Sequence, residues 1–188
     1  MSIILPHRMR RVVAGRGGGG SPLADVKSVI FDFATSHNAA NQYGIRQLTF
    51  GVGGSPITMN DTLSTTYNGS TTGPTYLAKF AFDTSLLLTG NHSTRGFLTS
   101  PGFGCPDRLN IVFNDPVTFD SLTAYNLHFS GTTYAYGVKD TKIYTSPSAI
   151  TDVNYGAAIA DGTLIFDGTI AAHTAVDEAD PQILSLLY

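Results

Sequence analysis

The chain has 188 residues, of which 42% are hydrophobic and 13% are charged, against about 25% charged residues in typical soluble proteins, and its net charge is −3. This composition excludes a charge-driven disordered chain and a coiled coil, because both need many more charged residues. The polar surface must come from Ser, Thr and Gly, which suit strands and turns. The sequence contains no run of 18 apolar residues, so it predicts no helix that spans a membrane.

The first residues differ in charge from the rest of the chain. Residues 1–27 carry five basic groups and one acid, a net charge of +4, whereas residues 28–188 carry six basic and thirteen acidic groups, a net charge of −7. Between the two parts lies the sequence GRGGGGS at residues 15–21, whose glycines have no side chains to pack. We therefore predict a basic, Gly-rich arm and hinge over residues 1–22 and a folded domain over residues 23–188.

The arm is expected to bind a neighbouring protein through Arg8, Arg10, Arg11 and Arg16. No strand precedes the glycines and no Gly-Lys-Ser or Gly-Lys-Thr follows them, which argues against a phosphate loop. Three clustered arginines on an acidic body give too small a basic surface for nucleic acid. About 20 extended residues reach about 70 Å, far enough to cross a neighbouring subunit; the alternative is a frayed terminus without a role.

Short apolar runs with period two predict a series of strands along the folded domain. Residues 53–74, rich in Gly, Ser, Thr and Asn, predict a long excursion or a weak hairpin, and residues 76–82 fit a strand and a helical turn equally well. The expected strands are residues 29–33, 43–52, 109–113, 122–129, 138–145, 163–166, 169–172 and 183–188.

Two turn signals stand out within this series. Asn114-Asp115-Pro116 is expected to end the strand over residues 109–113, because Pro is preset for a turn. Asp167-Gly168 is expected to form a hairpin turn between residues 163–166 and 169–172, since both residues tolerate positive φ.

The sequence predicts an all-β fold. No segment of ten or more residues shows a helical stripe free of Gly and Pro. The length of the chain and its eight or so strands favour a two-sheet jelly-roll sandwich with an extended N-terminal arm over a small barrel. No repeat of fixed period is present, which excludes propellers and solenoids.

Four segments resemble the discoidin, or coagulation-factor type C, family of galactose-binding-like jelly rolls. They are AFDTS at residues 81–85, RLNIVFNDPVTFDSL at 108–122, AYNLH at 124–128 and GVKDTKIYTS at 137–146. The chain departs from this family at its calcium-binding loop, where Asp83-Thr84-Ser85 replaces the usual motif, and in having no Trp. Asp83 is thus a weak Ca²⁺ candidate, because a calcium site needs six to eight oxygen ligands, and no cofactor is expected.

The resemblance implies ligand binding at loops on one rim of the sandwich. Sugar recognition uses an aromatic face and a few neighbouring hydrogen-bonding groups. The rim loops offer Tyr67, Asn68, Asn91, His92, Arg95, Tyr134 and Tyr136. Each has an alternative interpretation, because tyrosines at strand ends are mostly packing residues and a loop arginine is mostly solvated.

No catalytic constellation is expected. The five histidines are scattered without zinc-ligand spacing, and no Gly-x-Ser-x-Gly motif is present. Cys105, the single cysteine, has no disulfide partner within the chain. It precedes a proline and fits a small buried apolar group better than a nucleophile. Paired carboxylates of a glycosidase stay possible, since their separation is spatial, but most of the aspartates adjoin Gly or Pro or end strands, where turn chemistry explains them.

A basic arm, a glycine hinge and a Ser/Thr/Gly-rich jelly roll together resemble a bacteriophage tail, baseplate, fibre or decoration protein. The apolar residues 1–5 precede the basic cluster, the reverse of a signal peptide, so we expect synthesis in the host cytoplasm and a place in the virion. The sequence thus predicts a non-enzymatic virion protein, with other virion proteins, copies of itself and host surface glycans as partners. The alternative is a carbohydrate-binding module of an enzyme or cell-surface assembly.

Overall fold

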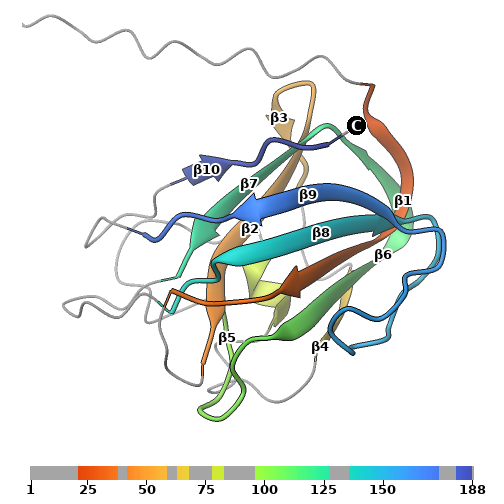
Figure 1. Cartoon of the computed structure of the whole chain (residues 1–188). Coiled ribbons are helices and arrows are strands. Elements are labelled where there is room, and N and C mark those ends of the chain that lie inside the picture. Colours follow the sequence, from red (N-terminus) through yellow and green to blue (C-terminus); the bar gives the residue numbers. More distant parts are fainter. Residues whose placement is uncertain are drawn as a thin grey trace, which may run out of the picture.

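The computed structural model describes residues 21–37, 42–58, 63–67, 78–82, 96–127, 136–173 and 181–187. Over these residues the chain forms two antiparallel sheets that pack face to face (Figure 1). The only helical element in this described part is a 3₁₀ turn, η1 (Ala78–Ala81), which lies in the region where a strand and a helical turn fitted equally well. The predicted all-β, two-sheet sandwich is confirmed.

Within the described residues, ten strands make up the two sheets. The first sheet has the order β4 (Leu63–Tyr67), β6 (Asp107–Phe119), β1 (Leu23–Phe33), β8 (Asp140–Ser146) and β9 (Thr163–Thr169). The second sheet has the order β10 (Pro181–Ile183), β7 (Ser121–Asn126), β2 (Gly44–Val52) and β3 (Ser55–Pro56), and β5 (Phe97–Leu98) also pairs with β2. Among the described strands only β2–β3 and β8–β9 follow each other within one sheet, and every other step from one strand to the next crosses to the other sheet.

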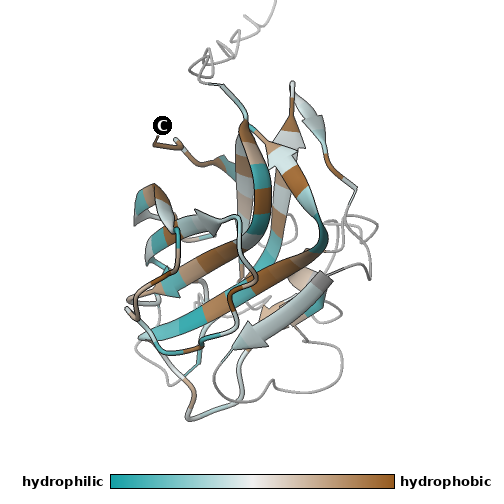
Figure 2. Ribbon diagram, turned by 90° about the vertical axis from the view of Figure 1, so that its right-hand side faces the viewer, coloured by the Kyte–Doolittle hydropathy of each residue, from teal (hydrophilic) through white to brown (hydrophobic). Residues whose placement is uncertain are grey.

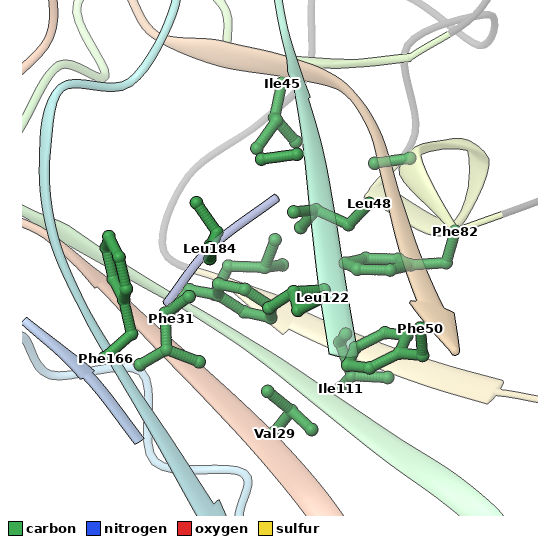
Figure 3. Packing of buried hydrophobic residues seen from close by; sticks show 14 of the residues in the cluster. Val29, Phe31, Ile45, Leu48, Phe50, Phe82, Ile111, Leu122, Phe166 and Leu184 are labelled. Carbon is green, nitrogen blue, oxygen red and sulfur yellow. The ribbon is translucent and has the colours of Figure 1, made fainter. Parts of the chain in front are cut away.

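The core lies between the inner faces of the two sheets. Alternate residues of β1 point inward, and Val29, Phe31 and Phe33 are fully buried, because side chains alternate between faces along a strand. They belong to one hydrophobic cluster with Leu48 and Phe50 from β2, and Figure 3 labels Val29, Phe31, Leu48 and Phe50 within it. Figure 2 shows the same alternation of hydrophobic and hydrophilic residues along several strands.

The outer face of the first sheet is also covered. Ser28, Ile30 and Asp32 of β1 point away from the core, yet all three are buried. Residues 147–162, which connect β8 to β9 and which we call the strap, lie over this face; Figure 1 shows them as the blue loop at the right. The backbone amide of Ile150 in the strap donates a hydrogen bond to Oγ of Ser28 at 2.9 Å.

The sandwich has two distinct ends. At the end that we call the rim, β1 finishes at Phe33, which pairs with Asp107 near the start of β6 and with Thr141 near the start of β8. The antiparallel pairings place the ends of β4, β7 and β9 and the start of β2 at the same end. At the opposite end, which we call the arm end, Leu23 at the start of β1 pairs with Phe119 at the end of β6. The backbone amide of Asp120 there donates to the carbonyl of Gly51 in the second sheet.

The turn predicted at Asn114-Asp115-Pro116 is wrong, because β6 continues through these residues to Phe119. The pairing of β6 with β1 is shifted here: Val26 pairs with Val117, whereas Ser28 pairs with Val112. Residues 113–116 therefore form a bulge, which accommodates a proline that cannot donate to the ladder.

The hairpin predicted at Asp167-Gly168 is also wrong. Both residues lie within β9, where Asp167 pairs with Lys142 and Gly168 with Thr141. The φ angle of Gly168 is outside the left-handed region, so the turn conformation that the dipeptide permits is not used. The connection between β8 and β9 is the strap instead.

Candidate functional site

The edges of the predicted ligand-binding loops meet at the rim. The ring of Tyr67, at the end of β4, contacts the ring of Phe97 in β5 at a centroid distance of 5.1 Å. The carbonyl of Tyr136 accepts a hydrogen bond of 2.7 Å from the backbone amide of Gly44, which also pairs with Leu98 of β5. The start of β2 thus lies between Tyr136 and β5, and Tyr67 packs on the same short strand.

Of the seven residues predicted to contact a ligand, Tyr67 and Tyr136 are described by the structure, and both are half-buried. Tyr67 packs against the hydrophobic core, so its ring serves packing first. The other predicted contacts, the weak calcium candidate and the arm arginines lie outside the described residues: Asn68, Asn91, His92, Arg95, Tyr134, Asp83, Arg8, Arg10, Arg11 and Arg16.

A buried polar network holds the rim together. The hydroxyl of Tyr43 donates a hydrogen bond of 2.8 Å to Oδ2 of Asp107, and the backbone amide of Arg108 donates to Oδ1 of the same carboxylate. Thr99 links this network to the segment before β6, because its Oγ1 accepts from the amide of Tyr43 and lies 2.6 Å from the carbonyl of Phe103. Burial, followed by the charge of Asp107, raises the pKa of Tyr43 well above its usual value, so the phenol stays neutral.

Cys105 lies beside this network, and its thiol is protonated at neutral pH. Burial raises its pKa from 9.0 to about 12, and the charge of Asp107 adds to the effect. Because the thiolate is the nucleophilic form, this geometry does not activate Cys105.

A second polar site lies on the outer face of the first sheet, under the strap. Asp32 and Arg108 are paired across β1 and β6, and the guanidinium binds the carboxylate through two hydrogen bonds. Nε of Arg108 lies 2.6 Å from Oδ1 and Nη2 lies 2.9 Å from Oδ2. Both side chains are almost fully buried, at 1% and 5% exposure. The hydrogen bonds to Asp32 raise the pKa of Arg108 further above its usual value, against the opposing effect of burial.

Side chains of the sheet fasten the strap at four points. In each case a buried donor on β1, β6 or β8 binds a backbone carbonyl of the strap at 2.7–2.9 Å. The pairs are Ser28 Oγ with Ser148, Arg108 Nη2 with Ala157, Asn110 Nδ2 with Asp152, and Ser146 Oγ with Ala160. Since a buried donor without a partner is costly, these four side chains favour the observed position of the strap.

The sequence prediction did not identify Asp32, Arg108 or Asn110 as a site. Each sits at an alternate position of a strand whose other residues enter the core, a pattern that predicts a solvent-exposed face. The pattern does not reveal the strap, a loop of 16 residues with four Ala and two Gly that lies over this face. An Arg and an Asp at directly paired strand positions would have been the usable signal, once the register of β1 against β6 was known.

Other site classes find no support in the described part of the chain. No group of three or more potential metal ligands occurs there, and none of its helical segments is long and apolar enough to cross a membrane.

No protein-family model, curated protein or solved structure matches this chain. The resemblance to galactose-binding-like domains and the virion assignment therefore stay predictions.

Proposed function

We propose that the protein is a non-enzymatic structural and adhesive component of a virion. In this proposal the N-terminal arm attaches the protein to neighbouring subunits, and the sandwich provides a surface for assembly or for contact with host glycans. One observation carries the proposal: the arm and the predicted ligand loops connect to opposite ends of the sandwich. The arm precedes β1 at Leu23, whereas Tyr67 and Tyr136 lie at the rim.

The separation of the two ends supports a division of labour. β1 has 11 residues, so its two ends are at most about 36 Å apart at about 3.3 Å per residue. A subunit held at the arm end would leave the rim free for a second partner. The charges agree with attachment through the arm, since a region of +4 on one copy would be attracted to the body of −7 on another copy.

The second candidate is a carbohydrate-binding module. It is favoured by the positions of Tyr67 and Tyr136 at one rim, where Tyr67 contacts β5 and Tyr136 contacts the start of β2. Such a module would need no partner at the arm end.

Native mass measurement of the full chain and of a variant without residues 1–21 tests the proposal. We expect the full chain to form oligomers and the shortened chain to stay monomeric with the same far-ultraviolet circular dichroism. A matched control replaces Arg8, Arg10, Arg11 and Arg16 by Ser at full length, and it should weaken association without removing the glycine hinge. A full chain that is monomeric, and that binds a glycan array equally with and without residues 1–21, would favour the second candidate.

A further inference from the structure

Two polar atoms under the strap lack a hydrogen-bond partner. They are Nη1 of Arg108 and Oδ1 of Asn110, and both are buried. Both residues have a relative exposure of 0%. A buried polar group without a partner destabilises the folded state, and most such groups in native proteins bind another group or an ordered water.

The hydrogen bonds that each side chain already makes identify which of its polar groups have no partner. Arg108 uses Nε and Nη2 for Asp32 and Ala157, which leaves the hydrogens of Nη1 as donors. Asn110 uses Nδ2 for Thr66 and Asp152, which leaves the lone pairs of Oδ1 as acceptors. A hydroxyl group accepts and donates at one oxygen, so it complements this pair.

Arg108 and Asn110 are neighbours on one face of β6. They are two residues apart, so their Cα atoms are separated by about 6.6 Å. Two consecutive hydrogen bonds through one oxygen span up to about 6 Å, so a single oxygen bridges the two side chains when Nη1 and Oδ1 lie slightly closer together than the two Cα atoms. The strap carbonyls of Ala157 and Asp152 lie beside the two side chains and keep bulk solvent away from them.

We propose that Arg108 and Asn110 bind one hydroxyl oxygen beneath the strap, with Nη1 donating to it and Oδ1 accepting from it. Two sources share this chemistry: a water molecule and the hydroxyl of a small alcohol or sugar. The site lies on the outer face of the first sheet, away from the rim, and is independent of the function proposed above.

Crystals of the full chain grown without alcohols or sugars, and the same crystals soaked in glycerol, test the site. In the unsoaked crystals we expect one ordered oxygen at about 2.7–3.2 Å from both Nη1 and Oδ1. Density that stays a single oxygen after the soak assigns the site to water, and density that extends into glycerol assigns it to an alcohol. The absence of an ordered oxygen in both crystals would overturn the proposal.

Two substitutions separate this role from the other bonds of Asn110. Asn110→Leu removes Oδ1 and should abolish the ordered oxygen. Thr66→Val removes a partner of Nδ2 but leaves Oδ1 in place, so the oxygen should stay. An oxygen that persists unchanged in Asn110→Leu would contradict the proposal.

A solution measurement covers the case in which Asn110→Leu does not fold. In the wild-type chain, magnetisation transfer from a long-lived water or hydroxyl proton to the Nη1 protons of Arg108 is expected. The absence of this transfer would also overturn the proposal.

Discussion

At the scale of single residues, the buried pair of Asp32 and Arg108 is the most consequential interaction outside the core. Removing two charges from water costs several kcal/mol per ion, and their attraction repays this cost only with good geometry. Here both carboxylate oxygens are bound by the guanidinium, and Nη2 also reaches the strap carbonyl of Ala157. Loss of one partner would leave the other charge buried.

Asp32→Asn is therefore expected to destabilise the protein by about 3–5 kcal/mol, the usual cost of an uncompensated buried charge. Chemical denaturation of the purified chain measures this loss. Asp167→Asn is the matched control, because Asp167 faces Lys142 at 3.4 Å with both side chains about half exposed, and its midpoint should not change. Equal midpoints for the two variants would show that Arg108 does not need Asp32.

The thiol of Cys105 provides a prediction about pH. Its pKa is about 12 in the folded chain and 9.0 in the unfolded chain, so folding favours the protonated form. The contribution of this thiol to the free energy of unfolding is fully present below pH 9 and is lost as the pH rises toward 12. The free energy of unfolding should fall more steeply above pH 9 in the wild type than in Cys105→Ala.

Alkylation by iodoacetamide measures the same thiol directly. At pH 8.5 the folded chain should react much more slowly than the chain unfolded in guanidinium chloride. Similar rates in the two states would contradict the burial of Cys105.

At the scale of elements, the strap depends on polar attachments to the sheet. Ser28 has a central place, because its hydroxyl donates to the carbonyl of Ser148 and accepts from the amide of Ile150. Ile30 under the strap is fully buried and Ile150 in the strap is 9% exposed, so the burial of apolar side chains accompanies these bonds.

Ser28→Ala should cost about 1–3 kcal/mol, because it leaves the Ser148 carbonyl and the Ile150 amide without their partner. Hydrogen exchange of the Ile150 amide should become faster, while exchange in β1 and β6 is expected to change less. Ser64→Ala on the exposed face of β4 is the control and should leave both measurements unaltered. An unchanged Ile150 exchange rate in Ser28→Ala would mean that the strap is held by its other contacts.

Two glycines in strands give a second comparison at this scale. A Cβ on Gly44 would lie 2.3 Å from the backbone oxygen of Phe97, whereas a Cβ on Gly168 would meet the end of the Phe166 ring at 3.1 Å. The backbone of β5 cannot move aside as the ring of Phe166 can, so Gly44→Ala should lower the free energy of unfolding by about 3 kcal/mol or more. Gly168→Ala should stay within about 1 kcal/mol. Thermal melting distinguishes the two, and equal melting temperatures would contradict the close approach of β2 and β5.

Most strands could be predicted from the sequence because one of their faces enters the core. β7 and β8 show the period of two that burial on one face imposes. β4 was missed, because LSTTY has few apolar residues and lies inside a polar stretch that also predicts a loop. Its place is set by pairing with β6, a contact between distant segments that no local pattern contains.

The two wrong turns have one physical cause. Asn114-Asp115-Pro116 and Asp167-Gly168 permit a turn locally, but the strands on either side of each are held in the first sheet. The same limit applies to the sites. The rim loops could be inferred from their composition, whereas the pairing of Asp32 with Arg108 needed the register of β1 and β6.

At the scale of the whole molecule, the arm end of the sandwich carries charges of both signs. The basic region enters the sandwich at the arm end, and described carboxylates also lie there, including Asp25, Asp115 and Asp120. Lys27 is at the same end, and its ammonium group donates to the carbonyl of Asn114. If copies associate through the arm, positive and negative surfaces of successive subunits meet at each contact.

This arrangement predicts that self-association of the full chain weakens with salt. Screening shortens the range of exposed charges from about 10 Å at 0.1 M to about 3 Å at 1 M ionic strength, so the dissociation constant from analytical ultracentrifugation should rise across this range. The variant with Arg8, Arg10, Arg11 and Arg16 replaced by Ser should associate weakly at 0.1 M and show little further change. Association that stays constant from 0.1 to 1 M in the wild type would point to an apolar contact and would remove the charges of the arm from the attachment.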